Sequence, residues 1–152
     1  MKKLETLAKE GKINENASIK DGHSIIINAP INKVWGVLTD LEKWPNWNPV
    51  IKNVSTGGKP EKGMNFKWTF DGTKYSSQIQ AIKEPETLAW TGKSSWIKSI
   101  HVWQLESDDN QTIASLSTSL QSTFAVLVNK HQKVYNDLIG WLECLKNTAE
   151  SN

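Results

Sequence analysis

The chain has 152 residues, of which 38% are hydrophobic and 22% are charged. This composition is typical of one packed domain and excludes a largely disordered chain. The formal net charge is only +2, and the sequence contains no arginine, which argues against a nucleic-acid-binding protein and against ligand recognition by a bidentate arginine clamp.

The first 22 residues are predicted to form a polar arm. They are mostly charged or polar, include one candidate short helix near Leu4–Lys9, and end in the turn-like pair Asp21-Gly22. A strand is expected from His23 onward, because the run HSIII is rich in β-branched residues. The sequence therefore divides into a polar arm, residues 1–22, and one folded domain, residues 23–149.

A short helix and a stiff, tryptophan-rich segment are expected after this strand. Pro30 suits the first turn of a helix, and apolar residues then recur at helical spacing over residues 31–41. In the run WPNWNP that follows, two prolines remove backbone donors and prevent a long helix. Residues 44–49 are therefore predicted to be a short helical turn from which Trp44 and Trp47 project.

The middle of the chain reads as a series of antiparallel strands. Apolar residues alternate with polar ones between Met64 and Phe70, which is typical of a sheet with one apolar and one solvated face. The pair Asp71-Gly72 is a strong signal for a two-residue hairpin. The expected strands cover residues 50–55, 64–70, 73–82, 87–92, 96–106 and 111–122.

The last segment is predicted to be one long amphipathic helix from Phe124 to Ala149. It contains no proline and only one glycine, and its apolar residues recur every three to four positions. A meandering sheet followed by a long helix indicates an α+β domain in which the curved sheet wraps the last helix.

Four short stretches in this order resemble the START-related, birch-pollen-allergen-like superfamily known as SRPBCC, and within it the polyketide cyclase/dehydrase and lipid-transport group. The resemblance covers about residues 27–149. The four stretches are INAPINKVWGVLTDLEKWPNWNP at 27–49, EPETLAWTG at 84–92, HVWQLE at 101–106 and WLECLK at 141–146.

This resemblance implies a helix-grip fold. In such a fold a curved antiparallel sheet of about seven strands wraps a long C-terminal helix, two short helices follow the first strand, and an elongated hydrophobic cavity is enclosed. The tryptophan-rich segment would then lie at one mouth of the cavity, where Trp44 or Trp47 would close it. The alternative is that both rings simply fill one end of the core.

The candidate ligand-binding residues are aromatic, apolar or hydroxyl-bearing side chains expected on the inner face of the sheet, on the tryptophan-rich segment or on the last helix. Eight tryptophans in one small domain favour a flat, apolar or aromatic ligand. The candidates are Trp44, Trp47, Phe66, Trp68, Phe70, Tyr75, Ser77, Trp90, His101, Trp103, Thr118, Leu120, His131 and Leu138.

His101 is the single candidate for a catalytic residue. It shares parity with Trp103, so it should face the same side of the sheet and could act as an acid, a base or a hydrogen-bond donor. The alternative is a satisfied core histidine. Related cyclase-like proteins commonly carry an acidic pair late in the last strand, whereas Ser117 and Thr118 stand there in this chain, which shifts weight from catalysis toward binding.

The sequence thus predicts a carrier for a small hydrophobic molecule such as a lipid, a quinone or a polyketide-like aromatic. We expect no cofactor, no metal site, no nucleic-acid partner and no stable membrane insertion, because the histidines lack metal-ligand spacing and the longest apolar run is too short to cross a bilayer. A single cysteine, Cys144, and the charged N-terminus favour a cytoplasmic protein in which this thiol is a small buried hydrophobe.

Two alternatives remain open at this point. One is a cyclase- or dehydratase-type enzyme that uses the same cavity with His101 as acid or base. The other is a protein-interaction module, which an exposed aromatic patch without a cavity would favour.

Overall fold

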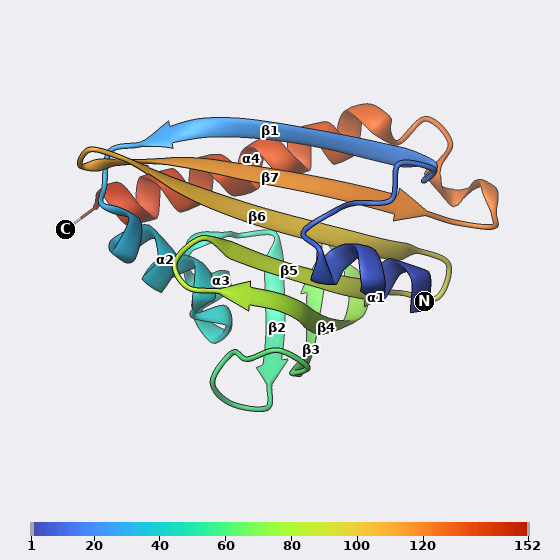
Figure 1. The fold of residues 1–152 in the computed structure, drawn as a ribbon. Coiled ribbons are helices and arrows are strands. Elements are labelled where there is room, and N and C mark those ends of the chain that lie inside the picture. The colour runs from blue at the N-terminus through green and yellow to red at the C-terminus, as the bar shows by residue number, and fades with distance from the viewer. Residues whose placement is uncertain (1, 152) are drawn as a thin grey trace.

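Seven strands form one curved antiparallel sheet in the spatial order β1-β7-β6-β5-β4-β3-β2 (Figure 1). The structure is a computed structural model that describes residues 2–151. The strands are β1 (Ile19–Ile27), β2 (Ile51–Thr56), β3 (Asn65–Phe70), β4 (Thr73–Lys83), β5 (Thr87–Lys93), β6 (Lys98–Asp108) and β7 (Gln111–Gln121).

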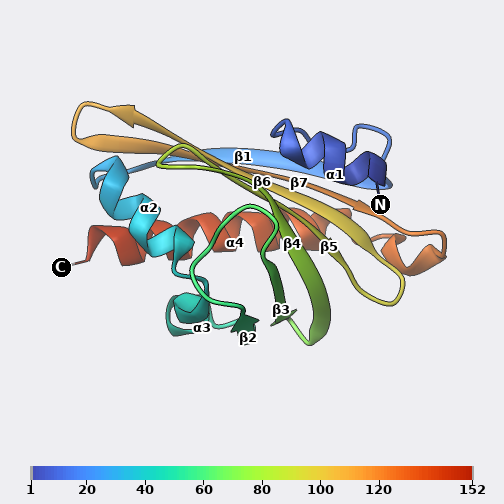
Figure 2. The same cartoon turned by 60° about the horizontal axis from the view of Figure 1, so that its bottom comes forward.

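Helices cover both faces of this sheet (Figure 2). The long C-terminal helix lies across one face, and α2 and α3 pack beside it, whereas α1 lies on the opposite face. This arrangement confirms the expected α+β helix-grip fold with two short helices after the first strand. The helices are α1 (Lys2–Lys9), α2 (Ile31–Thr39), α3 (Trp44–Trp47) and α4 (His131–Glu150), with single 3-10 turns η1 (Leu41–Lys43) and η2 (Ala125–Leu127).

The β3–β4 connection is the tight hairpin that the sequence predicts. Asp71 and Gly72 both have positive φ angles, 47° and 83°, as a two-residue turn of this twist requires. Asp71 tolerates the left-handed region better than most residues, and Gly72 adopts it without steric cost. The hairpin places the ends of β3 and β4 directly opposite α4.

The outer face of the central strands is buried, which differs from the solvated face expected from the sequence. Leu4 and Ala8 of α1 pack against Ala89 of β5 and against Ile100 and Val102 of β6, so a second small core forms on that face. Because α1 has only eight residues, its apolar pattern did not indicate from the sequence that the helix packs on the sheet. The short helix expected near Leu4–Lys9 is therefore a covering element of the sheet.

The first strand begins at Ile19, before the predicted start at His23. Asp21 and Gly22 do not form a turn; they lie inside β1 and pair with Thr118 and Ser117 of β7. A Cβ atom at Gly22 would lie 3.1 Å from the side-chain oxygen of Ser117. The glycine therefore permits a close approach between two strands, and a turn signal in the sequence was misleading here.

The last helix begins at His131, seven residues after the predicted start at Phe124. Residues between them form η2 and an irregular connection in which Asn129 has a φ of 61°, a left-handed conformation that interrupts a helix. Apolar residues at helical spacing continue through this connection, so periodicity alone could not locate the boundary.

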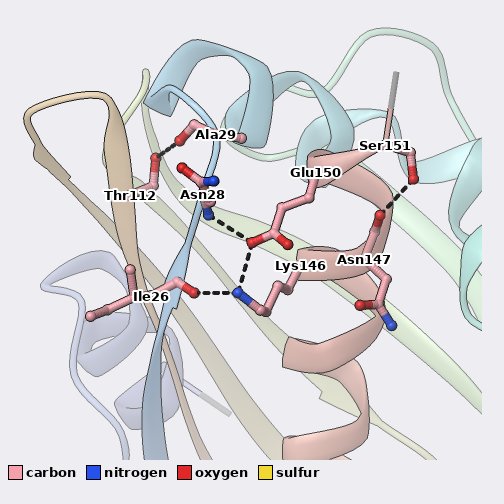
Figure 3. Close-up of polar contacts among 8 residues, drawn as sticks. All are labelled: Ile26, Asn28, Ala29, Thr112, Lys146, Asn147, Glu150 and Ser151. Carbon is pink, nitrogen blue, oxygen red and sulfur yellow. Dashed lines mark hydrogen bonds and ion pairs between the residues drawn. The ribbon is translucent and has the colours of Figure 1, made fainter.

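The C-terminal end of α4 is fixed to the start of the sheet by hydrogen bonds to backbone atoms (Figure 3). Lys146 Nζ donates to the carbonyl of Ile26 at 2.9 Å, and the backbone N–H of Asn28 donates to Glu150 Oε2 at 2.7 Å. Lys146 and Glu150 also pair with each other at 2.7 Å. Below these contacts Leu142, Leu145 and Ala149 are fully buried. This end of the helix is therefore part of the core.

Candidate functional site

A cavity of about 350 Å³ lies between the first half of α4 and the sheet. This volume falls in the range of roughly 300–1,000 Å³ that is usual for small-molecule sites. We call it the α4 cavity. It is lined by residues of β3, the β3–β4 turn, β4, the β5–β6 loop, β6, β7, the β7–α4 connection and α4. They are Trp68, Phe70, Asp71, Thr73, Tyr75, Ile97, His101, Leu116, Thr118, Leu120, Val126, Leu127, Lys130, Lys133, Val134, Asp137, Leu138 and Trp141.

Aromatic rings form the inner end of the cavity. The ring centroids of Trp68 and Trp141 are 5.5 Å apart, and those of Trp141 and Phe70 are 5.7 Å apart. Trp68 is held in place because its Nε1 donates to the side-chain oxygen of Ser77 at 2.9 Å. Tyr75 packs beside Trp68, with centroids 5.6 Å apart. These rings offer a flat, apolar surface to a ligand.

His101 lies in the same wall, between aromatic neighbours. Its imidazole stacks on the indole of Trp90, with centroids 5.2 Å apart and an interplanar angle of 14°, and it lies 6.0 Å from the ring of Trp141. Burial lowers the pKa of His101 to about 4, so the side chain is neutral near pH 7. Among residues 2–151, no hydrogen-bond partner contacts its buried Nδ1 atom.

Trp141 also presents a buried polar atom without a partner. Its Nε1 has no acceptor among the described residues, although the side chain is only 3% exposed. Thr118, in contrast, is satisfied, because its hydroxyl donates to the carbonyl of Ile100 at 3.2 Å. The cavity wall thus contains two side chains, His101 and Trp141, with unused hydrogen-bonding capacity in an apolar setting, where an unmade hydrogen bond is costly.

The outer rim of the cavity is charged. Lys133 of α4 lies 2.6 Å from Asp71 of the β3–β4 hairpin and 2.8 Å from Asp137 on its own helix. These hydrogen bonds raise the pKa of Lys133, and its side chain in turn lowers the pKa of the Asp71 carboxyl. Lys130 lines the same rim. The contact between Asp71 and Lys133 joins the hairpin to the helix across the opening.

Seven of the fourteen predicted binding residues lie on the wall of the α4 cavity and seven lie elsewhere. Those on the wall share one inner surface of the sheet and helix. They are Trp68, Phe70, Tyr75, His101, Thr118, Leu120 and Leu138. Outside the wall are Trp44, Trp47, Phe66, Ser77, Trp90, Trp103 and His131.

Most residues of the second group lie in the core and pack behind the residues that line the cavity. Phe66, Trp90 and Trp103 belong to the buried core, and Ser77 holds Trp68 as described above. His131 is an exposed residue at the start of α4, where its Nε2 lies 3.2 Å from the side chain of Asp21. Several of these residues alternate along their strands in step with cavity residues, but none of them lines the α4 cavity.

Trp44 is a core residue. It is 0% exposed, its Nε1 donates to the carbonyl of Leu38 at 2.9 Å, and its ring packs within 5.4–5.9 Å of Phe66, Trp68, Trp90 and Trp141. Trp47 is partly buried against the same core. This placement corresponds to the second reading of the tryptophan-rich segment, in which the rings fill the end of the core.

The sequence did not single out the charged rim or the β7–α4 connection. Asp71 and Lys133 are 62 positions apart, so their pairing depends on the hairpin meeting the helix. Trp141 is one of the apolar residues that recur at helical spacing in the predicted last helix, and this spacing does not distinguish a cavity residue from a core residue. Leu116 could have been predicted as a cavity residue, because it alternates in step with Thr118 and Leu120 on β7 and so faces the same side of the sheet.

Three further features bear on the predicted chemistry. Residues 2–151 hold no group of three or more His, Cys, Asp or Glu side chains placed to bind a metal ion. None of the helices in that part of the chain has the length and apolar content to cross a bilayer. Cys144 is partly buried on α4, and burial raises the pKa of its thiol.

Comparison with known proteins found a family match over most of the chain. The model of the family described as "Polyketide cyclase / dehydrase and lipid transport" matches residues 22–142. No curated protein matches the chain in sequence.

Solved structures share the fold at low sequence identity. The Zhui aromatase/cyclase from Streptomyces sp. R1128 superposes with a TM-score of 0.75 at 14% identity, over 86% of this chain and 93% of that one. A START superfamily protein from Mycobacterium smegmatis gives 0.73 at 13% identity, over 86% and 97%. Ara h 8.0201 gives 0.71 at 19% identity, over 88% and 98%.

Proposed function

Because this chain belongs to the polyketide cyclase/dehydrase and lipid transport family, we propose that it binds a small, largely apolar molecule in the α4 cavity. The observation that carries the proposal is the composition of the cavity wall: aromatic and aliphatic side chains inside, and charged side chains at the rim. Binding is driven by removal of apolar ligand surface from water, which contributes roughly 25 cal/mol per Å² before the ordering costs of association.

Two of the four buried nitrogen atoms without a partner among residues 2–151, on His101 and Trp141, belong to side chains of the cavity wall, and we expect them to favour a ligand that can form a hydrogen bond. Trp141 Nε1 is a donor only, so its partner must be an acceptor such as a hydroxyl or carbonyl oxygen. The neutral imidazole of His101 can either donate or accept. A flat apolar or aromatic molecule that carries one or two oxygen atoms at its buried end therefore suits the cavity better than a pure hydrocarbon.

A fluorescent probe tests whether the cavity binds apolar molecules. N-phenyl-1-naphthylamine, a neutral dye, should bind the protein with a rise in its emission. Val134→Trp places an indole in the cavity and should abolish binding, whereas Ile139→Trp, on the same helix but outside the cavity lining, should leave it intact. Equal dye binding by the two variants, with both folded by circular dichroism, would refute the assignment of the site.

A matched pair of ligands tests the polar anchor. We expect 1-naphthol to bind more tightly than naphthalene by roughly fivefold, because its oxygen can accept a hydrogen bond from the Trp141 indole. Trp141→Phe keeps an aromatic ring and removes the donor, so the difference between the two ligands should disappear. Identical affinities in the unsubstituted protein would remove the anchor from the proposal while leaving apolar binding in place.

A cyclase-type enzyme is the second candidate function, and the neutral imidazole of His101 is the observation that favours it. Such a side chain is unprotonated near pH 7 and can accept a proton from a polyketone-like substrate held against Trp68 and Trp141, but its lowered pKa makes it a weaker base than an ordinary histidine. The two carboxylates in the cavity wall, Asp71 and Asp137, both accept hydrogen bonds from Lys133 at the rim.

Turnover distinguishes the two functions. An enzyme should convert a linear poly-β-ketone to an aromatic product, followed by absorbance, and His101→Gln should remove this activity while dye binding persists. A carrier should bind the poly-β-ketone without changing its spectrum. Activity that survives in His101→Gln would exclude His101 as the base.

A further inference from the structure

Four exposed hydrophobic side chains gather at the open end of the α4 cavity. They are Trp96, Phe124, Val126 and Val128, with exposed fractions of 57%, 56%, 40% and 60%. We call them the mouth patch. Among residues 2–151, only two other large hydrophobic residues, Ile26 and Val50, are exposed to a comparable degree. Single exposed apolar residues are common on protein surfaces, but a cluster of this kind marks an interaction site.

The patch joins two loops that are distant in sequence. The rings of Trp96, in the β5–β6 loop, and Phe124, in the β7–α4 connection, meet edge to face with centroids 4.7 Å apart. Both views place these loops at the same end of the molecule (Figures 1 and 2). This contact holds both aromatic rings on one exposed surface and orders the two loops relative to each other.

The mouth patch is continuous with the cavity. Val126 belongs to both, and Ile97 and Leu127, the neighbours of Trp96 and Val126 in the chain, line the cavity wall. An apolar molecule that leaves the cavity beside Val126 therefore passes the patch. A surface that covers the patch would also shield that molecule from water during transfer.

The two segments that carry the patch bear charges of one sign, whereas the cavity rim beside them also holds Asp71 and Asp137, both paired with Lys133. Lys93 and Lys98 are exposed and stand directly opposite each other in the β5–β6 register, an arrangement of like charges that destabilises a strand pair. Lys130 follows the patch at the start of α4. The segments 93–98 and 119–131 contain no aspartate or glutamate. These two segments therefore present only positive charge to an approaching surface.

We propose that the mouth patch docks the protein on an anionic lipid bilayer, with the cavity opening toward the lipid. Trp96 and Phe124 would lie in the headgroup region, where amphipathic and aromatic side chains are favoured, and Val126 and Val128 would contact acyl chains. Lys93, Lys98 and Lys130 would face anionic headgroups, which attract basic side chains near a bilayer surface. Docking is reversible and involves no membrane-spanning segment.

Vesicle co-sedimentation tests the proposal. The protein should sediment with vesicles of phosphatidylcholine mixed with phosphatidylglycerol, bind vesicles of phosphatidylcholine alone weakly, and lose affinity as salt increases. Trp96→Ser combined with Phe124→Ser should weaken binding to the anionic vesicles by about tenfold or more, since binding scales with the apolar area buried. Ile26→Ser is the matched control, because Ile26 is 54% exposed near the opposite end of α4 and should not affect binding.

A second variant separates charge from apolar contact. Lys93→Gln combined with Lys98→Gln should reduce the salt dependence of binding and leave the melting temperature unchanged or higher, because two like charges are removed from opposite strands. Failure to bind anionic vesicles would overturn the proposal, as would equal binding by the Trp96/Phe124 variant.

Sedimentation velocity identifies the competing occupant of the patch. The protein could form a dimer that dissociates when Trp96 and Phe124 are replaced, and could fail to bind vesicles. This result would assign the patch to a second copy of this chain and refute membrane docking. The vesicle assay needs no bound ligand, so its failure is distinct from failure of dye binding in the cavity.

Discussion

The two halves of α4 lie against the same sheet but serve different purposes. In the second half Leu142, Leu145 and Ala149 are 0% exposed, and Lys146 and Glu150 reach backbone atoms of the first strand and the turn after it. The first two turns of α4, residues 131–137, have no fully buried side chain and are joined to their surroundings by the Lys133–Asp71 ion pair and by the contact between His131 and Asp21.

This difference shows how one helix can supply both a core and a binding site. Packed apolar contacts carry most of the stability of a helix in a protein, so the second half fixes α4 in position. The first half can then stand away from the sheet and leave the α4 cavity open. We expect substitutions in the two halves to separate stability from ligand binding.

The largest effect is expected from Leu142→Ala in the packed half. Leu142 is 0% exposed, and its truncation should lower the free energy of unfolding by about 2–5 kcal/mol through lost burial and an unfilled cavity. Val134→Ala, on the cavity wall in the first half of α4, should cost about 1 kcal/mol or less. Urea denaturation followed by circular dichroism measures both. Similar losses for the two variants would break the distinction between the halves.

Trp44→Phe tests how much the tryptophan-rich segment contributes to the stability of the core. The substitution removes the indole donor to the carbonyl of Leu38, one of the last carbonyls of α2, and should cost about 1–3 kcal/mol because a buried acceptor is left without its partner. The dissociation rate of N-phenyl-1-naphthylamine should stay unchanged. A faster rate with unchanged stability would instead identify Trp44 as a gate.

The pH dependence of stability should report the burial of His101. Because burial lowers the pKa of this side chain from 6.5 to about 4, the unfolded chain holds more protons than the folded one between these values. The free energy of unfolding should therefore fall as pH decreases, by about 2 kcal/mol between pH 7 and pH 5.

Substitution of single histidines isolates this contribution. His101→Gln should flatten the dependence of stability on pH, whereas His23→Gln, at an exposed position on β1, should leave it as it was. Denaturant midpoints at several pH values provide the measurement. A slope that persists in His101→Gln would mean that the imidazole is not held neutral by burial.

The smallest effect on stability is expected at the rim. Lys133→Ala removes two exposed ion pairs, which contribute little to folding, but it frees the hairpin from the helix and should speed dye dissociation by roughly a few-fold. Lys146→Ala is the matched control, because Lys146 also pairs with an acidic residue four positions later on α4. Stopped-flow release of the dye would show no contrast between the two variants if the rim did not limit access.

Much of the fold was predictable from the sequence because alternation and helical spacing are local signals. The hairpin at Asp71-Gly72 and the inward parity of Trp68, Phe70 and His101 follow from such signals. The docking of α1 on the outer face was not predictable, because Leu4 and Ala8 are buried only by contact with strands that are distant in the sequence.

The location of the cavity opening was harder to predict than its wall. The prolines near Trp44 indicated a special segment, but the hydrogen bond from Trp44 to the carbonyl of Leu38 draws that ring into the core. The opening lies instead where α4 starts late, after Asn129, and where Asp71 meets Lys133. Both features depend on contacts between distant parts of the chain.

Hydrogen–deuterium exchange of the α4 backbone amides, with and without N-phenyl-1-naphthylamine, tests the central claim most directly. Amides in the first half, up to Asp137, should exchange faster than those from Leu142 onward, and the dye should slow exchange in the first half and in the β3–β4 hairpin. Uniform protection along α4, or dye-induced protection confined to the second half, would contradict a helix divided into a packed end and a ligand-binding end.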